Sequence, residues 1–142
     1  MKELVVYDTN IFVSYLFPSK KVTAVRTVVD RIFDGYTIPV FSDEIMAEYE
    51  RVLHYDKFGF SDDSIRGLLD VIFDTCRYVI PVATRVLFRD ESDKCFYDAA
   101  ISAPADWLIT GNRKQASYSE CRFPDEPFIV SATEYVAHLR RA

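Results

Sequence analysis

Short apolar runs that alternate with helical stretches constrain the fold of this chain more than any other feature. Strands are expected at residues 4–7, 36–41, 77–82, 107–110 and 128–130. Spacing and capping signals predict helices at residues 22–33 and 43–54, after Ser61, up to Pro104 and from Ser131 onward. Strands joined by crossover helices pair in parallel, and a parallel sheet needs helices on both faces. The sequence therefore predicts a three-layer α/β/α fold whose central, mostly parallel sheet has about five strands.

The size and composition favour a single domain over residues 1–142. The chain has 142 residues, of which 49% are hydrophobic, and this suffices for one α/β core but not for two. Its apolar runs are far shorter than the roughly 20 residues of a membrane-spanning helix, and no signal peptide opens the chain. We expect a cytoplasmic protein that does not enter a membrane.

The charge and the content of cysteine and histidine limit the chemistry of the chain. Three cysteines without CxxC spacing and only two histidines argue against a zinc site, a disulfide framework and histidine-centred catalysis. The formal net charge of -5 argues against nucleic-acid binding through an overall positive field. An acidic balance fits either carboxylates that hold divalent cations or a basic partner that covers an acidic surface.

Two polar side chains directly follow expected strands. Asp8, within Asp8-Thr9-Asn10, ends the first strand, and Asn112 follows the strand at 107–110. Sites in open parallel sheets form beyond the carboxyl ends of the strands, so these two groups could share one rim. An Asx turn that caps the next helix explains Asp8-Thr9-Asn10 equally well.

An acidic residue within an apolar helix face gives a stronger indication. The face is formed at i, i+3, i+4, i+7 spacing by Ile45, Glu48, Tyr49 and Val52. A buried carboxylate without a partner is costly, so Glu48 needs a cation or hydrogen-bond donors. The alternative is a glutamate at the edge of the face that pairs with an arginine such as Arg51 or Arg26.

Asp93 begins a second helical face of the same kind. That face continues with Phe96, Tyr97, Ala100 and Ile101. Ordinary capping also accounts for Asp93, because a carboxylate at a helix start compensates the helix dipole. Asp98 lies next to the face and is a further candidate, whereas Asp90 and Glu91 in the preceding loop are better explained as solvated charges.

Asp8, Glu48 and Asp93 together suit a hard cation with oxygen ligands, such as Mg²⁺ or Mn²⁺. Such an ion can generate a hydroxide nucleophile and neutralise a phosphodiester transition state. Basic residues near the expected rim could hold a nucleic-acid backbone, although basic loops more often serve solubility. These residues are Arg85, Arg89, Lys94, Arg113 and Lys114.

Four motifs, in order along the chain, resemble the PIN (PilT N-terminus) domain family. The first two are the strand Val5-Val6-Tyr7 with Asp8-Thr9-Asn10, and the helix from Ser42 to Leu53 that carries Glu48. The other two are Asp90 to Asp106, with Asp93 in the catalytic position, and the turn Thr110-Gly111-Asn112. A terminal Ser-x-x-Glu-Tyr helix extends the resemblance over essentially the whole chain. Within the family, the chain is most similar to toxin components of toxin–antitoxin pairs, of the VapC type.

The resemblance implies a PIN-like fold and a metal-dependent endoribonuclease that hydrolyses RNA phosphodiester bonds and pairs with a protein antitoxin. Asp8, Glu48 and Asp93 would ligate Mg²⁺ or Mn²⁺ and position water for in-line attack on phosphorus. The accessory residues would be Asn10, Asp98, Thr110 and Asn112. The family often has a fourth carboxylate where this chain has Asn112, and an amide binds a second cation more weakly, so one or two metals remain open.

Two other functions fit parts of the sequence. A weakly active or inactive PIN module that binds RNA or a protein partner would explain Asn112 and the acidic balance. A phosphotransfer enzyme or receiver domain would also use strand-end aspartates. Phosphatases of the haloacid dehalogenase type, however, need an aspartate at position 10, where this chain has asparagine, and receivers resemble the Glu48 helix poorly.

The aromatic content of 15% exceeds what one small core obviously requires. Several of these residues cluster near the start of the chain: Phe12, Tyr15 and Phe17. Some of them could form a homodimer or antitoxin surface.

Overall fold

The computed structural model describes residues 2–17, 23–85, 88, 90–111 and 128–141 of the chain. The strands are β1 (Glu3–Tyr7), β2 (Thr37–Phe41), β3 (Arg77–Tyr78), β4 (Trp107–Thr110) and β5 (Phe128–Ser131). The helices are α1 (Thr9–Leu16), α2 (Thr23–Phe33), α3 (Asp43–Leu53), α4 (Asp62–Thr75), α5 (Glu91–Ser102) and α6 (Ala132–Arg141). A 3₁₀-helix, η1 (Asp56–Phe58), lies between α3 and α4.

The five strands form one sheet in the order β3-β2-β1-β4-β5, and every neighbouring pair is parallel. β1 is central: Val5 is in register with Pro39 of β2 on one side and with Trp107 of β4 on the other. The predicted α/β class with a parallel sheet of five strands is confirmed. Because neighbouring parallel strands end at the same edge, the residues that follow β1 and β4 lie close together.

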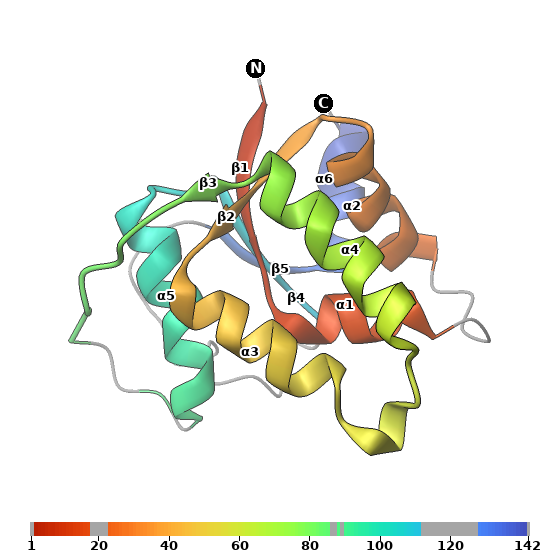
Figure 1. Ribbon diagram of the computed structural model, residues 1–142. Helices are drawn as coiled ribbons and strands as arrows, with labels where there is room; N and C mark the ends of the chain where they lie inside the picture. Colours follow the sequence, from red (N-terminus) through yellow and green to blue (C-terminus); the bar gives the residue numbers. More distant parts are fainter. Residues whose placement is uncertain (1, 18–22, 86–87, 89, 112–127, 142) are drawn as a thin grey trace.

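Helices cover both faces of the sheet, as a parallel sheet requires. Figure 1 shows α5 on one side and α2, α4 and α6 on the other. The helices α1 and α3 run across the lower end of the sheet in this view, where β1 ends. The carboxyl edge of the sheet is therefore bordered by α1, α3 and the start of α5.

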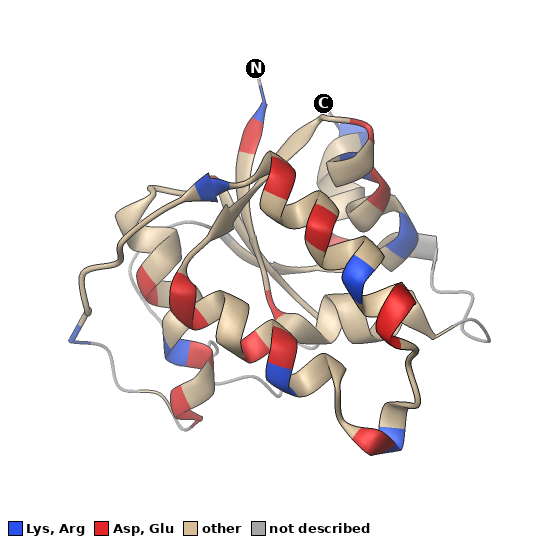
Figure 2. Cartoon of the chain, viewed as in Figure 1, with Lys and Arg blue, Asp and Glu red and all other residues tan. Residues whose placement is uncertain are grey.

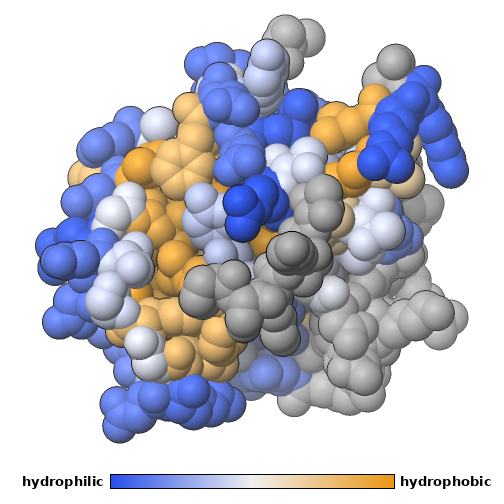
Figure 3. Space-filling view, turned by 90° about the vertical axis from the view of Figure 1, so that its right-hand side faces the viewer, coloured by the Kyte–Doolittle hydropathy of each residue, from blue (hydrophilic) through white to orange (hydrophobic). Residues whose placement is uncertain are grey.

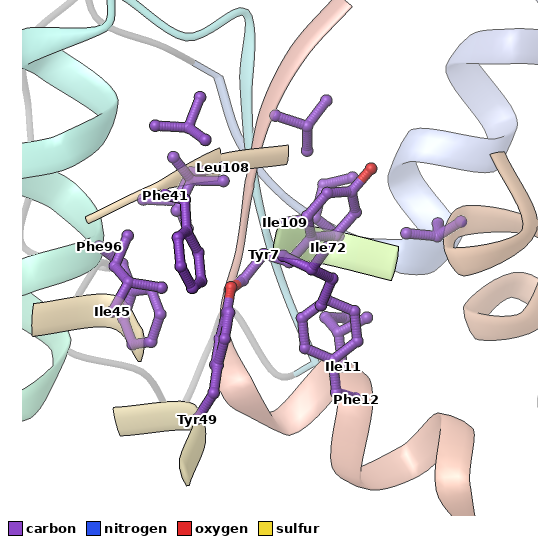
Figure 4. Packing of buried hydrophobic residues seen from close by; sticks show 14 of the residues in the cluster. Tyr7, Ile11, Phe12, Phe41, Ile45, Tyr49, Ile72, Phe96, Leu108 and Ile109 are labelled. Atoms are coloured by element: carbon purple, nitrogen blue, oxygen red, sulfur yellow. The ribbon is translucent and has the colours of Figure 1, made fainter. Parts of the chain in front are cut away.

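The core beneath this edge is rich in aromatic side chains. Tyr7, Phe12, Tyr49 and Phe96 are almost completely buried, and Figure 4 shows them around the end of β1. The rings of Phe12 and Tyr49 meet edge to face, with centroids 5.1 Å apart. The Tyr49 hydroxyl donates a hydrogen bond of 2.5 Å to the backbone carbonyl of Tyr7. This packing fixes α3 against the end of β1.

The burial of Phe12 contradicts the suggestion that it contributes to a homodimer or antitoxin surface. Its exposed fraction is 0%, because α1 turns this side chain into the core. Tyr15 and Phe17 are only half-buried. Tyr15 stacks on Phe33, and Phe17 meets Phe58 edge to face.

The predicted helix starts are confirmed in detail. Ser42 accepts a hydrogen bond from the Ile45 amide, and Ser61 accepts one from the Ser64 amide. At the start of α6, the Ser131 hydroxyl and the Glu134 carboxylate each accept a bond from the other residue's backbone amide, at 3.1 and 2.9 Å. This reciprocal pair is the predicted capping box.

Two elements differ from the sequence-based prediction. α1 begins at Thr9, immediately after β1, where only a turn was predicted. The strand predicted at 77–82 ends at Tyr78. β3 lies at the edge of the sheet, and Pro81 lacks the amide that a longer strand would use to donate ladder hydrogen bonds.

Apolar side chains also reach the surface. Figure 3, which faces the right-hand side of Figure 1, shows orange apolar areas among hydrophilic side chains. The most exposed large apolar residues of the described chain are Ile80, Val82 and Phe73, at 83%, 76% and 62%. Within the described residues, no helix is long and apolar enough to span a membrane.

Candidate active site

Asp8 lies at the carboxyl edge of the sheet and is held there by the end of the neighbouring strand. The Thr110 hydroxyl at the end of β4 donates a 3.0 Å hydrogen bond to the Asp8 carboxylate. The Asp8 side chain makes no N-capping hydrogen bond to α1, but the backbone amides of Thr9 and Asn10 interact with its carboxylate and lower its pKa. Both the start of α1 and the end of β4 therefore orient this carboxylate.

Asn10 connects the first turn of α1 to the same strand end. Its amide group donates to the Thr110 hydroxyl at 3.3 Å and accepts a 2.7 Å hydrogen bond from the Gly111 amide. A Cβ atom at Gly111 would lie 3.0 Å from the Asn10 oxygen, so glycine permits this close approach. Asn10 and Thr110 therefore support Asp8.

Burial makes Asp8 an unusual carboxylate. Only 6% of the residue is exposed. Desolvation, followed by repulsion from Asp93, raises the pKa of Asp8 to about 7, although the hydrogen bond from Thr110 opposes the rise. The fold thus buries one carboxylate, that of Asp8, within electrostatic reach of a second one, that of Asp93. Strongly perturbed carboxylates in clefts are typical of functional sites.

The carboxylates selected from the sequence line one cavity. This cavity has a volume of about 320 Å³, and its wall includes Asp8 from the end of β1, Glu48 from α3 and Asp93 from the first turn of α5. Asp90 also lines it, while capping α5 by accepting a hydrogen bond from the Ser92 amide. The sequence favoured a purely solvated role for Asp90. Figure 2 shows acidic segments at the end of β1, along α3 and at the start of α5.

Glu48 is paired with Arg51, one of the two arginines that the sequence offered as partners. One guanidinium nitrogen of Arg51 lies 2.8 Å from each Glu48 carboxylate oxygen. The same guanidinium bonds to the Tyr55 hydroxyl. The Glu48 side chain is 17% exposed and the Arg51 side chain 53%, so the pair lies at the mouth of the cavity.

The pKa of the Cys95 thiol is affected by the carboxylates of the site. Burial, followed by the negative charges of Glu48 and Asp8, raises the pKa of Cys95 to about 12. Cys95 therefore stays a neutral thiol at physiological pH, which makes it a poor nucleophile.

Basic and aromatic residues around the end of α3 and η1 line the same cavity. They are Arg51, which the sequence offered as a partner of Glu48, and three residues that the sequence did not single out, Tyr55, Lys57 and Phe58. The signal for them in the sequence is the close mixing of cations and aromatic rings between positions 51 and 60. The cavity thus has both acidic and basic-aromatic lining.

Two other predicted residues lie away from this cavity. Asp98 is buried, accepts hydrogen bonds from the backbone and hydroxyl of Thr84, and pairs with Lys94 at 2.8 Å. Neither Asp98 nor Lys94 lines the cavity. The Lys94 ammonium, which the sequence offered for an RNA backbone, is paired with the Asp98 carboxylate. Arg85 is exposed on the loop before α5. The remaining predicted residues, Arg89, Asn112, Arg113 and Lys114, lie outside the described residues.

Comparison with known proteins identifies the family. The family described as the PIN domain matches residues 4–114, which include every element from β1 to β4. The chain belongs to the PIN domain family. No curated protein matches this PIN domain closely.

A solved structure shares the fold of this PIN domain. It is the crystal structure of VapBC2 from Rickettsia felis bound to a DNA fragment from their promoter. The similarity has a TM-score of 0.57 at 16% identity, and it covers 90% of this chain and 98% of the other. At this identity the similarity establishes a common fold.

PIN domains are nucleases that generally depend on divalent metal ions. The carboxylates on the cavity wall offer only oxygen ligands, and neither cysteine nor histidine is among the described residues that line it. As the side chains stand, no three acidic, histidine or cysteine residues of the described chain form a cluster that could hold an ion. The Glu48 carboxylate is paired with the Arg51 guanidinium. The oxygen donors of Asp8, Glu48 and Asp93 are of the ligand type that a hard cation takes.

Proposed function

We propose that this PIN domain is a metal-dependent endoribonuclease and the toxin of a toxin–antitoxin pair. The observation that carries the proposal is the buried Asp8 carboxylate, whose ionisation is opposed by Asp93 in a cavity that Glu48 also lines. Keeping like charges together costs stability, which a divalent cation between them would offset. A purely structural role for these carboxylates does not account for that cost.

Asp8, Glu48 and Asp93 would hold the ion, and its oxygen-only ligand set favours Mg²⁺ or Mn²⁺ over softer metals. When bound, such an ion activates water and neutralises charge on the phosphodiester. Asn112, at the position of the fourth family carboxylate, would bind a second ion weakly. A single tightly bound ion is therefore the simpler arrangement.

The chain's own residues prepare this site. Thr110 and Asn10 fix the orientation of Asp8 through the end of β4, so the carboxylate needs little rearrangement. The surrounding core excludes water from behind Asp8, which strengthens electrostatic interactions at the site. Glu48, on the more exposed wall, is the group that can exchange partners.

The toxin role rests on the resemblance of the motifs to the VapC type and on the fold shared with a chain of the VapBC2 structure. We propose a protein antitoxin as the partner and single-stranded RNA as the substrate. Induced expression of the wild-type protein is expected to arrest growth, whereas Asp8→Asn is expected not to. Growth arrest by both proteins would separate toxicity from the carboxylate site.

The decisive experiment is cleavage of a mixed RNA panel by the purified protein with Mg²⁺ or Mn²⁺. We expect cleavage by the wild type and none after Asp8→Asn, Asp93→Asn or addition of EDTA. Asp70→Asn is the matched control, because it removes the same charge from an exposed position on α4. Cleavage that survives Asp8→Asn would refute the assignment of the site.

The Glu48–Arg51 pair favours a second candidate, a PIN module that binds RNA or a protein but cleaves weakly. In this case Arg51 would keep Glu48 from the metal. Arg51→Gln would then increase metal affinity and cleavage. If the wild type is silent with both metals while it binds Mn²⁺ and RNA, this second function replaces the first.

A further inference from the structure

The 3₁₀-helix beside the carboxylates carries a flat stack of aromatic rings. Tyr55 and Phe58 have ring centroids 6.0 Å apart and planes that differ by 26°. Phe58 and Phe60 follow at 5.5 Å and 20°, so three rings are nearly parallel. Phe17 contacts Phe60 edge to face at 5.0 Å and closes that end of the stack. Tyr55, at the other end, is 36% exposed.

Two cations accompany the rings. Lys57 places its ammonium nitrogen 5.7 Å from the Tyr55 centroid and 5.3 Å from that of Phe58. The Arg51 guanidinium lies 5.6 Å from the Tyr55 centroid. We call Arg51, Tyr55, Lys57 and Phe58 the η1 platform. Figure 2 shows a basic segment next to acidic ones on α3, and a second basic segment on η1.

The η1 platform and the carboxylates line the same cavity. A polyanion whose phosphate approaches Asp8 and Asp93 can therefore place its neighbouring unit next to the platform. In a nucleic acid that unit carries a flat base, and a flat base extends a stack of parallel rings. Cations beside the rings match the phosphates on either side of the base. Bases within a duplex are already stacked on their neighbours, so an unpaired base of a single strand is the form that can extend the rings.

We propose that Tyr55, backed by Phe58, forms a stacking subsite for an unpaired base of the substrate RNA, while Arg51 and Lys57 contact its phosphates. This inference rests on the proposed ribonuclease function and names the form of RNA that the site takes. An aromatic core under η1 would by itself explain Phe58 and Phe60. It does not explain why the exposed end of the stack, Tyr55, lies in the cavity between two cations.

The test measures equilibrium binding of a labelled single-stranded RNA 12-mer by fluorescence anisotropy, without divalent metal, in an Asp8→Asn background that prevents cleavage. Tyr55→Leu should weaken binding about tenfold, since one base stacked on an aromatic ring contributes roughly 1 to 3 kcal/mol. Tyr55→Phe keeps the ring and should bind within about twofold of its parent. Equal affinity of Tyr55→Leu and Tyr55→Phe overturns the inference.

Tyr36→Leu is the matched control. Tyr36 is 59% exposed, lies 5.1 Å from the Arg31 guanidinium, and does not line the cavity. Its loss should leave RNA affinity unchanged, and a tenfold loss there would show that exposed tyrosines act without a defined subsite. Circular dichroism and urea unfolding of each variant establish that Tyr55→Leu remains folded.

An abasic 12-mer separates stacking from a structural effect of the substitution. On this probe, Tyr55→Leu and Tyr55→Phe should bind equally, because no base is present to stack. A tenfold difference that persists on the abasic strand overturns the inference. So does a Tyr55→Leu variant that binds RNA normally but loses a protein partner, because the platform would then be a protein interface.

The failure of this inference can be distinguished from the failure of the proposed function. RNA binding that depends on Tyr55, in a protein whose wild type never cleaves RNA with Mg²⁺ or Mn²⁺, supports the subsite and refutes the nuclease. RNA cleavage that is the same in wild type and Tyr55→Leu supports the nuclease and refutes the subsite.

Discussion

The substitution Asp8→Asn should stabilise the metal-free protein and remove a specific part of its pH dependence. Asp8 has a pKa of about 7 in the fold, compared with 3.8 for an ordinary aspartate, because burial and Asp93 disfavour the charged form. A raised pKa means that the folded state binds the proton more tightly than the unfolded state. The contribution of the Asp8 proton to the free energy of unfolding is therefore fully present below pH 3.8, and it is lost as the pH rises through about 7.

The magnitude follows from the difference in pKa. A shift of about 3 units corresponds to about 4 kcal/mol over the whole range, at 1.36 kcal/mol per unit. About 3 kcal/mol of this falls between pH 5 and pH 8, since the unfolded carboxyl is already mostly ionised at pH 5. Asparagine keeps the shape of the side chain and an acceptor for Thr110, but it never ionises. The free energy of unfolding of Asp8→Asn should therefore lack this loss between pH 5 and pH 8.

The assay is urea unfolding in EDTA at several values of pH, monitored by the fluorescence of the single tryptophan, Trp107. The free energy of unfolding of Asp8→Asn, minus that of the wild type, should increase by about 3 kcal/mol from pH 5 to pH 8. Asp70→Asn, on the exposed side of α4, controls for net charge. If the free energies of unfolding of the wild type and Asp8→Asn change equally with pH, the argument that ionised Asp8 destabilises the metal-free fold is refuted.

Three other predictions concern residues that are not proposed metal ligands. Glu3→Ala should lower the free energy of unfolding by about 2 kcal/mol, because Glu3 accepts hydrogen bonds from Trp107 and Tyr135. RNA cleavage should not change, because these bonds lie at the opposite end of β1 from Asp8; an altered cleavage rate would contradict this. Tyr49→Phe should cost about 1 to 3 kcal/mol in urea unfolding, because the Tyr7 carbonyl loses its buried donor; an unchanged midpoint would show that another donor replaces it. Cys95 should react with iodoacetamide at pH 8 far more slowly than glutathione does, because its raised pKa keeps the thiol protonated. Mass spectrometry of the Cys95 peptide measures the rate, and rapid labelling would show that burial and the nearby carboxylates do not raise this pKa.

Periodicity and capping were sufficient to predict most of the fold. The helix starts at Ser42, Ser61 and Ser131 are local hydrogen-bond patterns, so the sequence contains all the information that they need. α1 was missed because Asp8-Thr9-Asn10 carries the composition of a turn, and a helix of eight residues offers little period to detect. Its apolar residues become helical only because the core receives Ile11 and Phe12.

Site residues could be predicted from the sequence where a single carboxylate stands in an unusual position. Asp8 after a strand and Glu48 in an apolar face stand out alone, and both line the cavity. Asp98 shows the limit of that reasoning. The buried Asp98 carboxylate is paired with Lys94 one turn earlier on α5, and it accepts hydrogen bonds from Thr84, whose position depends on a loop that the sequence does not reveal. The η1 platform was missed because stacking between Tyr55 and Phe58 depends on the three-dimensional turn of η1.

Glu48 finally shows why the two explanations offered by its sequence are not exclusive. Its carboxylate is paired with Arg51, as the structural alternative expected, and it also lines the cavity with Asp8 and Asp93. An exposed pair of this kind contributes little stability, so its separation costs little. Binding of a cation to Glu48 would release the Arg51 guanidinium beside Tyr55, where RNA phosphate is proposed to lie. With a nuclease-resistant RNA analogue, Mg²⁺ should therefore increase the salt dependence of binding in the wild type and not in Arg51→Gln, because only a freed arginine adds a phosphate contact. Equal salt dependence in the wild type and Arg51→Gln would show that Arg51 stays with Glu48.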